Sequence, residues 1–221
     1  MSIYQRINYK FHKFSLLFLI TGLSVMNFQT SEAQDLEFWT FVGGRTEWQE
    51  AEVLFHSANF FLPEGEYFLN HTQLMVNLPS KSHFSLGIGY KQEYVKFPGR
   101  LRAEYRPMLH LYYNKSWGGF DFMSRNRLGL RFMDGELINR YRNKFLFSYN
   151  KFKNFTPFFY TEPFFNLNKP EYTTQRTMLG ASIPIWNGLN LTLLLGNQMD
   201  KVKPDTWSGK FMLGTFLTYN F

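Results

Sequence analysis

The stretch that decides the fold is "FMLGTFLTYNF", residues 211–221, with which the chain ends. Its odd-numbered positions carry Phe, Leu, Thr, Leu, Tyr and Phe, and its even-numbered positions carry Met, Gly, Phe, Thr and Asn. A period of two residues is that of a β-strand, because successive side chains point to opposite faces. The last residues of a soluble domain usually fray, whereas here the final residue is as apolar as those before it. The stretch therefore predicts a strand that is held in a sheet up to Phe221.

The N-terminal segment has the features of a cleavable secretory signal. Three basic residues precede an apolar run at residues 14–25, and "SEA" at 31–33 has the small-x-small pattern of a signal-peptide cleavage site. The apolar run is too short to span a bilayer comfortably as a helix. We therefore expect a signal peptide over residues 1–33 and one mature domain over residues 34–221.

The composition excludes several functional classes. Because the chain has no cysteine, it cannot form a disulfide framework, a thiol nucleophile or a cysteine-based metal site. Removal of residues 1–33, with three basic residues and one acidic residue, lowers the formal charge from +7 to +5. A mild positive excess is weak evidence for any particular partner.

The mature sequence has no run of about 18 apolar residues that could form a transmembrane helix. Yet 20% of the residues are aromatic and the mean hydropathy is only −0.30, so apolar residues are abundant but spread along alternating segments. This combination is typical of a transmembrane β-barrel, whose strands each carry a weak hydropathy signal. We predict an all-β fold, an antiparallel transmembrane β-barrel, located in the cell outer membrane.

Polar punctuation divides the chain after residue 66 into nine strands. Tight turns are predicted to alternate with longer connections, the turns at 78–81, 114–117, 151–154 and 186–189 and the longer connections at 95–99, 134–139, 166–171 and 200–205. Outer-membrane barrels alternate in this way and have an even number of strands in bacterial single-chain proteins. We therefore expect residues 36–61 to supply a tenth strand. That region reads almost like two strands, so twelve strands remain a second solution.

The two rows of each predicted strand differ in polarity. Over residues 100–114 one row carries Leu101, Tyr105 and Leu109, and the other carries charged residues such as Arg102 and Glu104. Lipid outside and charge inside is the reverse of a soluble sandwich. In the last strand the row that ends in Phe221 faces lipid. The final residue is then part of an aromatic interface belt and closes the barrel against the first strand.

The inward row is rich in basic residues. It contains ten bases and four acids, namely Arg100, Arg102, Arg106, Arg125, Arg127, Arg131, Arg140, Arg142, Lys144 and Arg176 with Glu93, Glu104, Asp121 and Glu162. One interpretation is a narrow barrel filled with paired charges, since a buried arginine needs a carboxylate partner. The other is a basic vestibule that passes small anions or holds an anionic headgroup or sugar, because guanidinium groups suit carboxylates and phosphates.

An enzyme is the other class to consider. His83 and Ser85 lie two residues apart on one face, as a barrel-borne lipid hydrolase would require. However, His83 directly follows a predicted tight turn, which places it at the periplasmic end and away from outer-leaflet lipid. An orienting acid is not identifiable either. We therefore predict no catalytic residue and no enzymatic activity.

Metal, cofactor and nucleic-acid sites are not expected. The mature histidines lie singly on different strands without the spacing of a zinc site, at His56, His71, His83 and His110. Tryptophans near the predicted strand ends are explained better as belt residues than as stacking platforms for bases. The prediction is therefore no metal, no cofactor and no nucleic-acid partner.

Several stretches resemble one family. They are "SLGIGYKQ" (85–92), "RAEYRPMLHLYY" (102–113), "SRNRLGLRF" (124–132), "INRYRNKF" (138–145) and "TPFFYTEPFF" (156–165). In these stretches R-N-R precedes R-Y-R and then an acidic residue in an aromatic strand. Over residues 38–221 the chain resembles domain of unknown function 2490 (DUF2490), a set of predicted outer-membrane barrels of Gram-negative bacteria. The resemblance implies a fold and a location but no activity and no catalytic residue.

We therefore expect a non-enzymatic outer-membrane barrel, a small passage or binding barrel with an arginine-rich lumen that favours anionic solutes or headgroups. The alternatives are a structural envelope barrel and a lipid-modifying enzyme that uses His83 and Ser85. The expected partners are outer-membrane lipid, small anions, and the barrel-assembly machinery through the C-terminal strand that ends at Phe221.

Overall fold

The computed structural model describes residues 35–63, 65–80, 82–97, 100–203 and 206–221, and the regular elements among them are eleven β-strands. The strands are β1 (Asp35–Trp48), β2 (Ala51–Phe61), β3 (Tyr67–Asn77), β4 (Phe84–Phe97), β5 (Arg100–Trp117), β6 (Phe120–Met133), β7 (Glu136–Tyr149), β8 (Thr156–Asn166), β9 (Glu171–Trp186), β10 (Leu189–Lys203) and β11 (Thr206–Asn220). These residues include no helix long and apolar enough to cross a membrane. The signal peptide expected over residues 1–33 lies outside the described residues.

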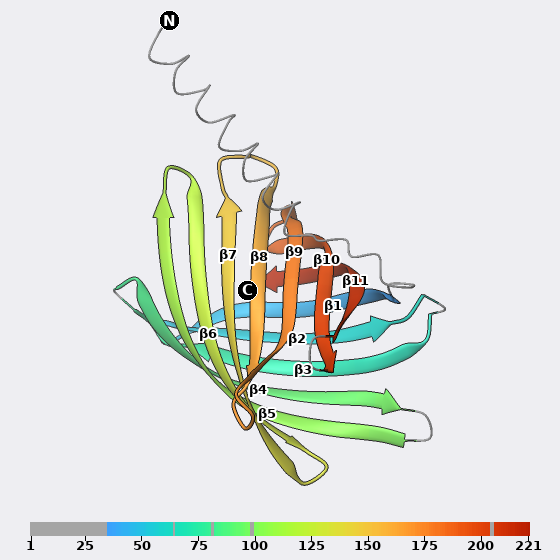
Figure 1. The fold of residues 1–221 in the computed structure, drawn as a ribbon. Coiled ribbons are helices and arrows are strands. Elements are labelled where there is room, and N and C mark those ends of the chain that lie inside the picture. Colours follow the sequence, from blue (N-terminus) through green and yellow to red (C-terminus); the bar gives the residue numbers. More distant parts are fainter. Residues whose placement is uncertain (1–34, 64, 81, 98–99, 204–205) are drawn as a thin grey trace, which may run out of the picture. The chain divides into compact units, whose positions relative to one another are not determined.

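The strands close into a barrel. Each strand pairs antiparallel with the next one along the chain, and β1 pairs with β11 to complete the circle. Figure 1 shows β6 to β9 as one wall, which crosses the strands of the opposite wall at a steep angle. The closing pair is parallel, with Trp39 opposite Gly214. In a chain of antiparallel neighbours, an odd number of strands makes the first and last run in the same direction.

The expected number of ten strands is wrong by one. The nine strands predicted after residue 66 are present, but residues 36–61 supply two strands instead of one. The turn between β1 and β2 consists of Gln49 and Glu50, which both have a positive φ. Two-residue turns with positive φ normally contain glycine or asparagine. Because neither Gln49 nor Glu50 is a typical turn residue, the sequence gives no signal of a turn between β1 and β2.

The expected alternation of short and long connections is also wrong. We name the ends of the barrel by the closing strands: β1 begins at the N-terminal end and β11 finishes at the C-terminal end. Two-residue turns occur at both ends, with Asp134–Gly135 at the N-terminal end and Gly118–Gly119 and Asn187–Gly188 at the C-terminal end. Segments that look like polar loops continue as paired strands, as Ile138 does opposite Arg131. Backbone ladder bonds form there whatever the side chain.

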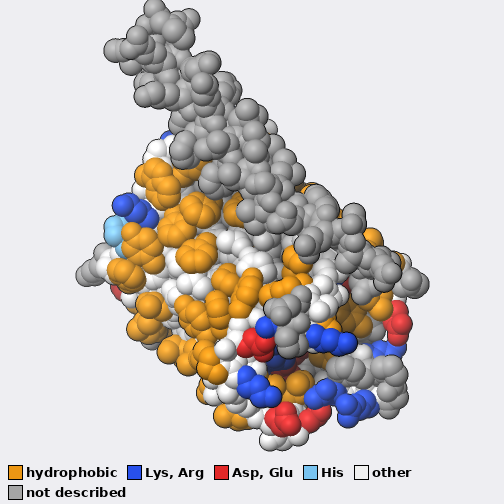
Figure 2. Space-filling model, viewed as in Figure 1, with side chains coloured by type: hydrophobic (Ala, Val, Ile, Leu, Met, Phe, Trp, Pro, Cys, Tyr) orange, Lys and Arg blue, Asp and Glu red, His pale blue; other side chains and the backbone are white. Residues whose placement is uncertain are grey.

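The two faces of the barrel differ as the alternation predicts. Along β5, Met108 and His110 are buried while Leu109 and Leu111 are exposed. The row of β11 that ends at Phe221 is exposed as well. Figure 2 shows apolar side chains spread over much of the visible strand surface and charged ones gathered toward the lower right. The outer surface is therefore largely apolar, and the polar and charged rows point inward.

Part of the lumen is filled by an apolar cluster. This apolar cluster consists of Trp39, Phe41, Ala58, Phe60, Tyr160, Met178, Leu194 and Met212. They come from β1, β2 and β8 to β11, whereas most inward charges come from β4 to β9. At Gly196 a Cβ atom would lie only 2.6 Å from the Sδ atom of Met178, so glycine leaves the space that Met178 occupies. The lumen thus has one apolar wall and one charged wall.

Candidate anion site in the lumen

Four arginines share one buried carboxylate on β8. Glu162 is 2% exposed, and its carboxylate lies 2.7 Å from Nη2 of Arg142 and 2.9 Å from Nη2 of Arg125. The corresponding distances are 3.4 Å to Arg127 and 3.8 Å to Nη1 of Arg176. One carboxylate cannot neutralise four guanidinium groups. The group, which we call the Glu162 cluster, therefore has a formal excess of positive charge.

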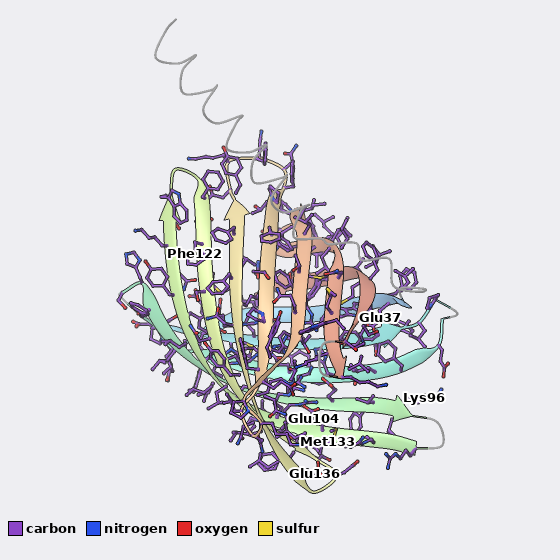
Figure 3. The ribbon with its side chains drawn as sticks, viewed as in Figure 1. Glu37, Lys96, Glu104, Phe122, Met133 and Glu136 are labelled. Carbon is purple, nitrogen blue, oxygen red and sulfur yellow. The ribbon has the colours of Figure 1, made fainter. Side chains whose placement is uncertain are left out.

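A second carboxylate on β5 binds the neighbouring bases. Glu104, labelled in Figure 3, accepts hydrogen bonds from Nε of Arg106 at 2.7 Å and from Nε of Arg131 at 2.8 Å. Beside it, Lys91 pairs with Glu93, and Arg106 lies 3.9 Å from Glu93. Three bases meet two acids here, so this region is closer to neutral than the Glu162 cluster.

A third group of charges lies against the apolar wall. Nζ of Lys210 lies 3.0 Å from Glu37 and 3.7 Å from Asp200. The indole N–H of Trp39 donates to Glu37 at 3.0 Å, and the hydroxyl of Thr174 donates to Asp200 at 2.8 Å. Glu37 and Asp200 are therefore already bound by donors of the barrel itself. Sequence reasoning missed these residues, although Lys210 lies in the inward row of the final strand.

A cavity of about 270 Å³ lies between these groups, in the half of the lumen toward the N-terminal end. The bases on its wall are Lys91, Arg106, Arg140, Arg142, Arg176 and Lys210, and the acids are Glu37, Glu93 and Asp200. Aromatic rings also line the cavity, including those of Trp39 and Phe164. The cavity has space for several waters or one small molecule.

Three guanidinium groups gather around the ring of Phe164. The Cζ atom lies 3.7 Å from the ring centroid for Arg142, 5.2 Å for Arg176 and 5.9 Å for Arg140. Arg142 is bound to Glu162, and Nε of Arg176 donates to Gln198 at 3.0 Å. Within the described part of the chain, Arg140 has no carboxylate within 4 Å. Arg140 is therefore the guanidinium on the cavity wall whose only described partner is a ring.

Of the ten predicted inward bases, Arg106, Arg140, Arg142 and Arg176 line the cavity, and the other six do not. Arg100 is exposed at the first position of β5, and Arg102 pairs with Asp134 at 2.5 Å near the same end of the barrel. Lys144 lies with Nζ 3.6 Å from the ring centroid of Tyr160. These bases lie inside or at the rim of the barrel but not around the cavity.

Asp121 lies apart from the arginine clusters. It accepts hydrogen bonds from the hydroxyl of Ser116 at 2.5 Å and from the amide of Asn150 at 2.9 Å, near the C-terminal end of the barrel. Of the four predicted inward acids, Glu93, Glu104 and Glu162 pair with lumen bases, whereas Asp121 binds Ser116 and Asn150.

The histidines are distributed differently from the sequence expectation. His83 is exposed and its ring lies 5.9 Å from that of Tyr113, while Ser85 lies on β4 with a half-buried side chain. His56 and His71, on adjacent strands, approach each other with 3.2 Å between their Nε2 atoms. The residues that the structure describes contain no group of three or more His, Asp or Glu side chains that could hold a metal ion.

The fold and the lumen define a class: a closed β-barrel with an apolar exterior and an interior that carries excess basic charge. The chain belongs to the family described as "Protein of unknown function (DUF2490)", whose sequence model matches residues 26–209. The match covers β1 to β10 and the start of β11, so the family resemblance seen in the sequence is confirmed. No curated protein matches the chain.

Proposed function

We propose that the protein is a non-enzymatic binding barrel of the cell outer membrane, whose lumen holds a small anion. The observation that carries this proposal is the Glu162 cluster, in which four arginines share one carboxylate beside a cavity. Like charges in a poorly solvated interior repel one another unless a counter-charge is present. An anion in the cavity would supply that counter-charge.

The outer surface supports a membrane location. Exposed apolar side chains stand along the outward rows, such as Val42 and Leu101, which are each 63% exposed. Outward polar side chains bind one another: the hydroxyl of Tyr141 donates to Asn126 at 2.5 Å, and Asn143 donates to Asn126 at 2.8 Å. Lipid offers no hydrogen-bond partner, so a membrane barrel must satisfy such groups internally.

Aromatic residues at the strand ends support the same location. Four strands that run toward the C-terminal end of the barrel finish with Trp48, Trp117, Tyr149 and Trp186. The three tryptophans are exposed. Indole rings collect at the boundary between hydrocarbon and water, so these residues suit an interface belt.

Outer-membrane lipid is the first expected partner. An apolar groove of about 650 Å³ runs over β1, β9, β10 and β11, and exposed residues on its wall include Leu179, Leu193, Leu195 and Leu213. Acyl chains would fill this groove in a bilayer. The barrel-assembly machinery is the second expected partner, through the exposed row of β11 that ends at Phe221.

Binding is favoured over passage because inward side chains of both clusters are buried and do not line an open path. Met178 and Met212 of the apolar cluster are 0% exposed, and Glu162 and Arg127 are 2% and 6% exposed. The test is the current carried by the purified, refolded protein in a planar bilayer at low and high salt. We expect no steady current. A steady anion-selective current would replace the binding function by a passage function.

Location is tested separately by fractionation. We expect the mature protein in the outer-membrane fraction, with a gel mobility that changes on heating as the barrel unfolds. Recovery from the soluble periplasmic fraction would overturn the location and leave the fold unchanged. A barrel that fractionates with the membrane but binds no anion would favour the structural envelope role.

A further inference from the structure

We infer that the cavity near the N-terminal end binds a small organic anion, with its oxyanion on Arg140 and a flat apolar body against Trp39, Phe60 and Phe68. This inference rests on the proposed anion-binding function. It goes further by assigning the chemical class of the ligand: one carboxylate or phosphate group carried on a single ring or a body of similar size.

Arg140 supplies the anchor. Arg140 lines the cavity with its Cζ atom 5.9 Å from the ring centroid of Phe164, and the described residues place no acceptor against its guanidinium. The two neighbouring guanidinium groups are already held, Arg142 by Glu162 and Arg176 by Gln198. A guanidinium presents parallel N–H donors that match the two oxygens of a carboxylate or phosphate. The free donors of Arg140 therefore fit an incoming oxyanion.

The aromatic wall supplies the second half of the site. The rings of Trp39 and Phe60 meet edge to face with centroids 4.9 Å apart, and the ring of Phe68 lies 6.2 Å from that of Phe60. All three residues line the cavity. An inorganic ion would make no use of this surface, whereas an apolar body would bury area against it.

The position of Phe68 is set by an irregularity in the sheet. Phe60 pairs with Leu69 and Phe61 pairs with Tyr67, so Phe68 is an extra residue in β3. Its place in the alternation would otherwise put it on the outer face, yet it packs against the apolar cluster and lines the cavity. Bulges commonly redirect a side chain next to a functional site.

The carboxylates of the cavity do not compete for Arg140. Glu37 is bound by Lys210 and Trp39, and Asp200 accepts from Thr174. Glu93 pairs with Lys91. These acids also disfavour a second negative group on the ligand at their side of the cavity. A volume of about 270 Å³ lies at the lower limit of small-molecule pockets, which excludes a nucleotide or a long acyl chain.

The test uses Trp39 as a reporter in the refolded full-length mature barrel, after replacement of the other four tryptophans with phenylalanine. The probes are benzoate and phenyl phosphate, with inorganic phosphate and benzyl alcohol as the matched ion and the matched neutral ring. We expect saturable fluorescence changes with at least one aromatic anion. Inorganic phosphate and benzyl alcohol should each bind at least about tenfold more weakly than that anion. The aromatic anion that binds more tightly shows whether the site prefers a carboxylate or a phosphate ester.

Variants assign the site. Arg140→Gln should weaken binding of the preferred probe about tenfold or more, and Arg140→Lys should restore part of the loss. Phe68→Leu, which keeps an apolar side chain, should weaken binding of the aromatic anion more than it weakens binding of inorganic phosphate. Arg45→Gln is the charge-matched control, because Arg45 pairs with Glu52 near the opposite end of the barrel. It should leave binding unchanged.

The outcomes separate the two proposals. If inorganic phosphate binds as tightly as phenyl phosphate and both depend on Arg140, the assignment of an organic ligand is wrong and the anion-binding function stands. Equal losses in Arg140→Gln and Arg45→Gln would also overturn the assignment of the site. If no anion binds a barrel that shows the heat-dependent gel mobility of a folded protein, the anion-binding function itself is overturned.

Discussion

Arg142 binds two neighbours on β8 at once: its Nη2 atom lies 2.7 Å from Glu162, and its Cζ atom lies 3.7 Å from the ring centroid of Phe164. Glu162 and Phe164 are two residues apart and therefore point to the same side of the strand. A carboxylate and an aromatic face thus hold one guanidinium from two directions. This arrangement ties β7 to β8 inside the lumen and fixes the position of the positive charge beside the cavity.

Removal of the shared carboxylate tests how much the arginine cluster depends on it. Glu162→Gln keeps the shape of the side chain but leaves four guanidinium groups without their common counter-charge. We expect a loss of about 3–5 kcal/mol in the free energy of unfolding, as for other broken buried ion pairs. Urea unfolding in detergent micelles measures it. Asp121→Asn, outside the cluster, is the control, and equal stability of the two variants would contradict a structural role for Glu162.

The sequence predicts those features of the fold that depend on neighbouring residues, and it fails where a feature leaves no local pattern. The alternation in residues 211–221 is local, so it is sufficient to predict the strand and the exposed row that ends in Phe221. The predicted number of strands is wrong because one turn gives no sequence signal: Gln49 and Glu50 adopt positive φ, although neither is glycine or asparagine. An error of one strand changes the direction of the closing pair from antiparallel to parallel.

The site was only partly predictable for a different reason. The inward row and its excess of arginine follow from parity along each strand, and the structure brings Arg125, Arg127 and Arg142 together around Glu162. Contacts across the barrel depend on strand register and closure. Lys210 meets Glu37 over 173 positions of sequence, and no local pattern indicates that pair.

The close packing of the apolar wall is tested at Gly196. Gly196→Ala would place a Cβ atom against Met178 and the backbone of Thr177. We expect a destabilisation of about 1–3 kcal/mol, because the core must shift to accept the methyl group. Gly209→Ala, also in a barrel strand, has nothing within 4 Å of the added atom and is the matched control. A neutral Gly196→Ala variant in the same urea titration would show that Met178 does not fill the lumen there.

The obstruction of the lumen is tested by opening it. Met178 and Met212 are fully buried in the apolar cluster, so replacing both with alanine should create a cavity. Each substitution should cost about 2–5 kcal/mol of stability, and the folded fraction should gain a measurable conductance in a planar bilayer. Met133→Ala, near the end of β6, should remain silent. A double variant that folds and still carries no current would place the obstruction elsewhere, in the charged clusters.

The membrane location is tested by the depth dependence of a single charge on the outer row of β5. Leu101 and Leu109 are both exposed, but Leu101 lies one residue from the strand start and Leu109 lies at mid-strand. In a bilayer, an arginine costs about 2–4 kcal/mol at the midplane and about 0–1 kcal/mol near the interface. We therefore expect Leu109→Arg to destabilise the barrel in lipid vesicles much more than Leu101→Arg does. In water both positions face solvent, so two near-neutral variants would show that this surface does not contact lipid.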